Sequence, residues 1–508
     1  MRRALAVVAL VGVALPTFAL VRPDAIFTSN MVLQRDKVVP VWGKADPGEK
    51  IVVEFAGQRV FGTAGNDGRW EVLLQPLKVC AEGHDMVIGP HKLQNVVVGD
   101  VWLVSGQSNA EMSFAWGILD GEREMAESDR CPNIRAVKID HKTTPFDGLD
   151  RTPTMFNAWM VCNKETLGCV TAMGYFFARE LNRQTGVPIG ILNDNWSGCR
   201  IEPFVCLEGM RQVPALSNEV AKVERIRREY VNWCRLVASA KDDASRGRAG
   251  ARPEDMMWTV QHNAMIEPLI RFPICGCAWY QGCSNGGEGP EYVDKLRALI
   301  GGWRAKWGYD FPFYIVQLSS FTAKTDDPAG GNGYARTREA QRIAAETIPK
   351  CGLVVTIDIG NATDIHPKNK RDVGERLARW ALRDVYGQAD LVVSGPLFKE
   401  MKVTGNRAII AFTHVGGGLM AGEKGPDAPG VKPVPSADGK LRGFSIRGKD
   451  GVWHWADAKI VGDTVVLTAD GVDAPVAARY AYRANPMGDC NLYNREGLPA
   501  SPFATDRW

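Results

Sequence analysis

A serine, a histidine and an aspartate occupy positions in the sequence from which they could form an ester-hydrolysing site. Ser108 lies in Ser105-Gly-Gln-Ser-Asn109, directly after the apolar run Val101–Val104 and directly before the helix formers Ala110–Met112. An apolar run, a glycine turn and a helix predict a strand-turn-helix unit, in which a serine hydroxyl stands beside free backbone N–H groups. Those conditions suit a nucleophilic serine, although an isolated Gly-x-Ser is more typical of a serine that caps a helix.

His366 is the best candidate for a base among the seven histidines. It lies in Asp364-Ile-His-Pro-Lys-Asn-Lys370, between a predicted strand and a predicted helix. A histidine that takes the serine proton and a carboxylate that orients the imidazole together allow acyl transfer. Asp364 is the expected orienting carboxylate, and Asp358, earlier in the same segment, is the alternative.

Further polar residues follow the predicted strands 187–193 and 276–280 and could stabilise an oxyanion. Gly198 follows the first of these strands, and a glycine allows its N–H to approach a ligand closely. Gln281 and Asn285 follow the second strand and carry neutral amide donors, which suit a developing oxyanion. Gln107, beside the serine, completes the set of expected oxyanion and substrate-binding residues.

Residues 98–390 contain the alternation of strands and helices that would bring these side chains together. The predicted strands are 101–104, 134–139, 187–193, 276–280, 313–318 and 353–357, and the predicted helices are 171–184, 291–307, 336–347 and 370–386. This βαβ alternation predicts an α/β core with a mostly parallel sheet, helices on both faces and chemistry at the carboxyl ends of the strands. A charged helical insertion is expected at about 205–262.

Three other segments flank this core. Residues 20–97 and 391–508 contain short alternating strands separated by turn residues, which predict an N-terminal and a C-terminal β domain. Residues 1–19 have the two arginines, the short apolar run and the small residues of a secretory signal peptide. We therefore expect a secreted or periplasmic protein.

Composition excludes several classes of partner. Without the two arginines of the signal peptide, Lys and Arg fall from 61 to 59 against 58 Asp and Glu, so nothing favours nucleic acid or anionic lipid. No other stretch is long and apolar enough to span a membrane. Cys162 with Cys169 and Cys199 with Cys206 are candidate disulfide pairs among the twelve cysteines. No metal site and no cofactor are predicted, and the sequence leaves the oligomeric state open.

The sequence resembles the sialate O-acetylesterase family of carbohydrate esterases, within the SGNH/GDSL hydrolases, in blocks spread over nearly the whole mature chain. The blocks are Asn30–Arg35, Trp42-Gly43, Asp46–Gly48, Val101–Asn109, Gly174–Glu180, Val187–Ile191, Asn263–Ile266, Trp279–Gly282, Pro312–Leu318, Arg338–Gln341, Asp364–Lys370 and Asn491–Phe503. The resemblance implies a three-layer α/β/α SGNH-like core with flanking β-sandwich-like domains. It also implies Ser108 as nucleophile, His366 as base and Asp364 as its orienting residue.

The chain departs from the family pattern at the edge of the expected site. Ser197-Gly198 stands where the family usually has two glycines, and Cys283 stands where it usually has a glutamate. Ala110 replaces a common methionine, and Asp364 is two rather than three residues from His366. These differences bear on substrate choice and on which carboxylate orients the histidine.

These observations predict a serine esterase that removes O-acetyl groups from carbohydrates through an acetyl-enzyme intermediate. The substrate is expected to be an acetylated sugar or glycan, either a sialic acid or a plant or algal polysaccharide. Trp116, Trp196, Trp279 and Tyr280 are candidate sugar-stacking residues. A carbohydrate-binding protein on a decayed esterase scaffold is the alternative from another class, because of Cys283.

Overall fold

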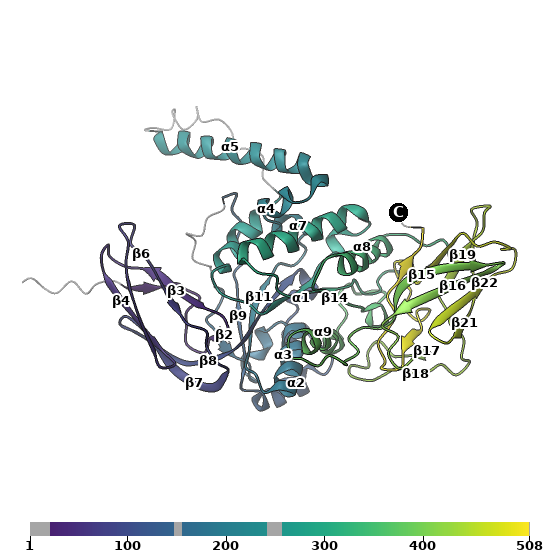
Figure 1. The fold of residues 1–508 in the computed structure, drawn as a ribbon, viewed down its shortest axis with the longest axis horizontal. Coiled ribbons are helices and arrows are strands. Elements are labelled where there is room, and N and C mark those ends of the chain that lie inside the picture. Colours follow the sequence, from purple (N-terminus) through teal and green to yellow (C-terminus); the bar gives the residue numbers. More distant parts are fainter. Residues whose placement is uncertain (1–20, 147–154, 241–256, 507) are drawn as a thin grey trace, which may run out of the picture.

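A computed structural model describes residues 21–146, 155–240, 257–506 and 508. The predicted signal peptide at 1–19 lies outside the described residues, as do residues 241–256 of the predicted insertion. Figure 1 shows an elongated molecule with N-terminal strands at one end, an α/β body in the centre and C-terminal strands at the other end. The long helix α5 (Ser217–Ser239) stands away from the body.

The centre of the body is a sheet with the strand order β10-β9-β11-β8-β12-β13-β14. The strands are β8 (His91–Gly106), β9 (Ile134–Lys138), β10 (Met160–Val161), β11 (Ile189–Asn195), β12 (Gly276–Tyr280), β13 (Phe313–Val316) and β14 (Cys351–Val354). Along this order the neighbouring strands from β9 to β14 run parallel, and the edge strand β10 is antiparallel to β9. The predicted parallel sheet is therefore confirmed, with β8 in its middle.

Helices cover both faces of this sheet, as buried parallel strands require. The helices of the body are α1 (Ser108–Glu111), α2 (Gly121–Glu127), α3 (Ala172–Thr185), α4 (Leu207–Arg211), α7 (Pro290–Trp307), α8 (Tyr334–Thr347) and α9 (Lys370–Asp384). Buried residues of α3 and α9 pack with Trp102 and Val104 on one face of β8. Buried residues of α4, α7 and α8 pack with Val101 and Leu103 on the other face. Alternate residues of one strand thus supply the two apolar layers.

The N-terminal β region and the body share a strand. The N-terminal strands are β1 (Arg22–Pro23), β2 (Val32–Gln34), β3 (Val39–Lys44), β4 (Lys50–Phe55), β5 (Gln58–Thr63), β6 (Arg69–Leu74) and β7 (Cys80–Ile88). β7 pairs antiparallel and β2 parallel with the first half of β8. The strand predicted at 101–104 therefore extends back to His91, across the predicted boundary at 97/98, because no turn residue interrupts the buried run from Val96 to Val98.

The C-terminal region is all β, as predicted from its short alternating runs. Its strands are β15 (Leu397–Thr404), β16 (Arg407–Thr413), β17 (Leu419–Glu423), β18 (Val434–Pro435), β19 (Phe444–Arg447), β20 (Trp453–Trp455), β21 (Asp457–Val461), β22 (Thr464–Thr468), β23 (Ala477–Tyr480), β24 (Leu492–Asn494) and β25 (Phe503–Ala504). They form two four-stranded sheets and one three-stranded sheet. None of the described helices has both the length and the apolar character needed to cross a lipid bilayer.

Candidate active site

Ser108 stands where the central strand β8 ends and the chain turns into α1, so the predicted strand-turn-helix unit is confirmed. The turn depends on Gly106, whose φ of 137° favours glycine. A Cβ at this position would lie 2.2 Å from the carbonyl oxygen of Tyr280 on β12. The close approach of β8 and β12 therefore requires a glycine two residues before the serine.

His366 lies in the loop that leads from β14 into α9, and its side chain reaches the serine. The Nε2 atom of His366 is 2.8 Å from the Oγ atom of Ser108, a hydrogen-bond distance. Burial lowers the pKa of His366 below its usual value, Asp364 opposes that change, and Lys370 and Lys368 add to it. The imidazole is therefore neutral at neutral pH, as a general base must be.

Asp364 contacts the histidine through both backbone and side chain. Its Oδ1 atom accepts a hydrogen bond of 2.8 Å from the backbone N–H of His366 and lies 3.5 Å from the ring Nδ1. The carboxylate side chain is 41% exposed. The sequence separation of two residues thus allows Asp364 to face the imidazole.

Asp358, the alternative orienting residue, pairs with an arginine and not with His366. Its two carboxylate oxygens each accept a hydrogen bond of 2.7 Å from the guanidinium of Arg376 on α9. Both side chains are buried. A bidentate buried pair of this kind fixes the carboxylate, so the geometry favours Asp364 over Asp358 as the partner of His366.

The predicted oxyanion donors Gln281 and Asn285 lie beside the site, but their amide N–H groups bond to other protein groups. The Nε2 atom of Gln281 lies 2.9 Å from the Oδ1 atom of Asn285 and 3.2 Å from the Oε1 atom of Gln107. The Nδ2 atom of Asn285 donates to Glu202 at 3.1 Å and to Glu288 at 3.2 Å. The geometry thus gives these two amides a structural role.

Gln107 has a different arrangement. Its Oε1 atom accepts hydrogen bonds from the backbone N–H groups of Gly282 at 3.1 Å and Ser284 at 3.4 Å. Its Nε2 group has no hydrogen-bond partner within the part of the chain that the structure describes. Of the three predicted amides, Gln107 therefore has the donor available for a ligand.

Gly198 lies in the loop after β11 with a φ of 72°, which again favours glycine. The buried Glu111 of α1 fixes this loop by accepting hydrogen bonds from the backbone N–H of Ser197 at 2.8 Å and from its hydroxyl at 2.6 Å. Although burial disfavours its charged form, the hydrogen bonds from Ser197 and Lys138 lower the pKa of Glu111. Ser197, where the family pattern has a glycine, thus anchors the loop to the helix that begins with Ser108.

The four candidate sugar-stacking residues divide into two groups. Trp279 and Tyr280 are fully buried in the body and are not available to a ligand. Trp116 is 41% exposed and meets His366 edge-on, with ring centroids 5.7 Å apart. Trp196 is half-buried and stacks on His141 at 4.6 Å. Of these four residues, Trp116 and Trp196 therefore retain exposed aromatic surface.

The cysteines do not form the candidate disulfides. All twelve are free thiols in the structure, and Cys206 instead caps α4 by accepting a hydrogen bond from Gly209. Burial raises the pKa of the Cys283 thiol, so Cys283 is a neutral group at the edge of the site. Among the described residues, no group of three or more His, Cys, Asp and Glu side chains is placed to hold a metal ion.

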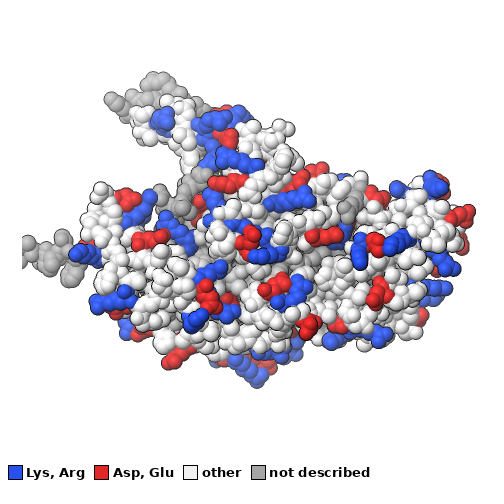
Figure 2. Space-filling model, in the orientation of Figure 1, with Lys and Arg blue, Asp and Glu red and all other residues white. Residues whose placement is uncertain are grey.

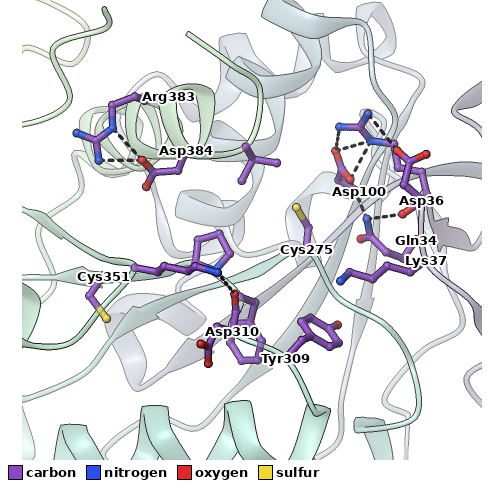
Figure 3. Close-up of a pocket in the computed structure, with 15 residues that line it drawn as sticks. Gln34, Asp36, Lys37, Asp100, Cys275, Tyr309, Asp310, Cys351, Arg383 and Asp384 are labelled. Atoms are coloured by element: carbon purple, nitrogen blue, oxygen red, sulfur yellow. Dashed lines mark hydrogen bonds and ion pairs between the residues drawn. The ribbon is translucent and has the colours of Figure 1, made fainter. Parts of the chain in front are cut away.

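A separate cavity of about 800 Å³ opens at the opposite edge of the sheet. Its lining includes Cys275, Pro312 and Cys351, which lie at the amino ends of β12, β13 and β14. Figure 3 shows Lys37 and Tyr309 on the same side of this cavity, and the Lys37 ammonium lies 3.6 Å from the centre of the Tyr309 ring. This cavity does not contain Ser108 or His366.

The sequence did not predict the roles of two residues that shape the site, the buried Lys370 and Glu111, which anchors the Ser197 loop. Lys370 begins α9, is 1% exposed, and donates a hydrogen bond of 2.6 Å to Asn109. Burial lowers its pKa to about 7. Lys370 lies in the same short block as His366, but nothing in a linear sequence shows that a lysine at the start of a helix is buried.

Comparison with known proteins places this geometry in a family. No model of a protein family matches the chain. A carbohydrate acetylesterase from Xanthomonas citri, known from a crystal structure, is 34% identical, with a TM-score of 0.79 over 96% of this chain and 100% of that one. Sialate O-acetylesterases from Mus musculus and Homo sapiens are each 25% identical to this chain. Those two alignments cover 93% and 94% of this chain and 92% and 90% of the relatives. The chain therefore belongs to the sialate O-acetylesterase family and is a carboxylic ester hydrolase.

Proposed function

We propose that the protein removes O-acetyl groups from carbohydrates through a Ser108–His366–Asp364 site and an acetyl-enzyme intermediate. The observation that carries the proposal is the distance of 2.8 Å between the Nε2 atom of His366 and the Oγ atom of Ser108. A neutral histidine at this distance can take the hydroxyl proton as the oxygen attacks a carbonyl carbon. The relatives support an O-acetyl ester as the bond that is broken.

The reaction proceeds in two transfers. Ser108 Oγ attacks the acetyl carbonyl while His366 takes its proton, and the resulting tetrahedral intermediate expels the sugar oxygen, which receives that proton. Water then attacks the acetyl-enzyme, with His366 again accepting a proton, and acetate leaves as Ser108 is reprotonated. Asp364 stabilises the imidazolium that exists between these proton transfers.

The backbone N–H groups of Ser108 and Gly198 are the proposed oxyanion donors. Neither N–H has a hydrogen-bond partner within the described part of the chain. Gln107 adds a side-chain donor, since its Nε2 group is likewise without a described partner. Preorganised donors aimed at a developing oxyanion are each worth about 3–4 kcal/mol of transition-state stabilisation.

Turnover of p-nitrophenyl acetate tests the site. Ser108→Ala and His366→Ala are each expected to lower kcat by about a thousandfold or more, because nucleophile and base act as one unit. His84→Ala, which removes an exposed histidine from the N-terminal β region, is the matched control and should retain activity. Wild-type rates in either active-site variant would refute the site, and a wild type without turnover would favour the carbohydrate-binding alternative.

Acetylated polysaccharide is a second candidate substrate beside acetylated sialic acid. Lysines and arginines lie among acidic residues on the face shown in Figure 2. The sequence as a whole has 61 Lys and Arg against 58 Asp and Glu, so its charge does not favour an anionic sugar over a neutral one. The relative at 34% identity is named for carbohydrates in general. Acetate release from O-acetylated sialic acid and from acetylated xylan, measured side by side, separates the two substrates.

The N-terminal segment supports a secreted or periplasmic location. Two arginines, an apolar run and small residues within residues 1–19 form the pattern of a signal peptide. The sequence of the mature N-terminus after expression in a secreting host is the test. A mature protein that begins at Met1 would contradict this location.

A further inference from the structure

A buried lysine links the two loops that carry the proposed nucleophile and base. The ammonium of Lys370 donates a hydrogen bond of 2.6 Å to the Oδ1 atom of Asn109, which directly follows Ser108. The Nδ2 atom of Asn109 in turn donates a hydrogen bond of 3.0 Å to the carbonyl of Ile365, which directly precedes His366. Two hydrogen bonds therefore connect α9, the serine turn and the histidine loop.

The lysine occupies an unusual position for its charge. It is 1% exposed, and no carboxylate lies within ion-pair distance of its ammonium among the described residues. A buried lysine without a carboxylate partner costs stability, so its presence calls for a compensating role. Asn109 is equally buried, at 1% exposure, so water does not compete with the bond between them.

We propose that Lys370 is a positioning residue that, through Asn109, holds the Ser108 turn against the His366 loop. This proposal rests on the proposed function, because it concerns the geometry of the same serine and histidine. Ser108 and His366 come from segments 258 positions apart in the sequence. Their contact distance is therefore set by the packing of two loops, and a direct bond between those loops restricts it. Small misplacements of reacting groups lower the rate of reaction much more than the affinity for substrate.

The charge of Lys370 provides a readout that a merely structural residue would lack. The charges of Lys368 and Asp364 act on Lys370, the neighbouring Cys283 thiol is neutral, and Lys370 lowers the pKa of His366. The ring of Tyr280 forms another side of its pocket, with the ammonium 5.4 Å from the ring centre. Because Lys370 is protonated below pH 7, its charge is present in the range where His366 titrates.

The test compares Lys370→Met, which keeps the length of the side chain but removes its charge and donors, with the wild type. On p-nitrophenyl acetate, kcat should fall about ten- to a hundredfold, while KM stays within about twofold. The acid limb of kcat/KM against pH should move upward by about half to one unit, since a nearby positive charge is lost. Lys402→Met is the matched control, because Lys402 is a 70% exposed lysine on β15 of the C-terminal region, and this variant should retain the kcat and the pH profile of the wild type.

Asn109→Ala and the double variant Asn109→Ala/Lys370→Met complete the experiment. If Lys370→Met fails to fold, Asn109→Ala alone tests the link. If the two residues act as one link, each single variant loses about the same kcat, and the double variant loses no more than either. Losses that multiply in the double variant would overturn the proposal. So would wild-type kcat in a folded Lys370→Met or Asn109→Ala enzyme. If either result is obtained while Ser108→Ala is inactive, the proposed link between Lys370 and Asn109 is wrong and the proposed Ser108–His366 site still holds.

Discussion

Asp194 is a buried carboxyl group that makes the stability of the protein depend on pH. It lies on β11, opposite Ser105 of β8, and is 0% exposed. Neither of its carboxylate oxygens has a hydrogen-bond partner in the described part of the chain. Burial raises the pKa of Asp194 from 3.8 to about 8. The group is therefore protonated in the folded state at neutral pH and ionised in the unfolded state.

The sign and size of the effect follow from linkage. Because the folded pKa is raised, the stability that Asp194 contributes is fully present below pH 3.8 and is lost as the pH rises to about 8. Between pH 3.8 and pH 7, an interval of about 3 pH units, Asp194 is ionised in the unfolded chain and protonated in the folded one. At 1.36 kcal/mol per unit, this difference lowers the free energy of unfolding at pH 7 by about 4 kcal/mol. Asp194→Asn keeps the shape of the side chain and removes its titration. The variant should therefore gain about 4 kcal/mol relative to the wild type between pH 4 and pH 7.

Urea denaturation at several values between pH 4.5 and pH 8.5 measures this gain. Tryptophan fluorescence reports on the α/β body, because Trp279 and Trp303 are fully buried there. Asp463→Asn, at an exposed position beside β22, is the matched control and should follow the wild type at every pH. The reasoning is refuted if the difference in urea midpoint between Asp194→Asn and the wild type is the same at pH 5 and pH 8.

Two further predictions concern the site itself. Because Asp364 raises the pKa of His366, Asp364→Asn should move the acid limb of kcat/KM to lower pH and reduce kcat about tenfold or more. Asp358→Asn should leave that limb in place. It should instead lower the free energy of unfolding by about 3–5 kcal/mol, because it leaves the buried Arg376 unpaired. Equal pH profiles in these two variants would contradict the assignment of Asp364. Trp116→Ala should raise KM for an acetylated glycan by about three- to tenfold and leave p-nitrophenyl acetate turnover within about twofold, since only the glycan is large enough to stack on the ring. Equal losses on both substrates would place Trp116 in support of His366 instead.

The parts of the fold that depend on local pattern were predictable. The apolar run before Gly106 predicts the end of β8, and the strand predicted at 276–280 coincides with β12. His366 was identifiable because a loop between a strand and a helix in a parallel sheet ends at the edge where Ser108 lies. The N-terminal boundary was less predictable, because a strand that continues from one region into another gives no turn signal at the transition.

The roles of individual polar groups depended on contacts that no linear pattern contains. Gln281 and Asn285 are amides of the type that an oxyanion requires, but their donors face Gln107, Glu202 and Glu288. Asp358 and Asp364 both follow β14, and their partners distinguish them: Arg376 on α9 pairs with Asp358, whereas His366 contacts Asp364. Amide and carboxylate side chains near a site bond with whichever partner the tertiary packing brings closest, so their residue type alone does not fix their role.

The hydrogen bonds around Ser108 indicate which part of the site determines its chemistry and which part determines its substrate. The loops around the nucleophile are bonded to one another: Gln107 holds the 281–285 segment, Glu111 holds Ser197, and Asn109 holds the histidine loop. These contacts are buried or partly buried, so substrate binding need not order them, and the geometry of the proposed acyl-transfer site exists before the substrate arrives. Trp116, in contrast, is exposed and takes no part in these bonds. Differences in sugar specificity within such a site should therefore arise from substitutions at the aromatic rim, while substitutions among the bonded loops should change the rate on every ester alike.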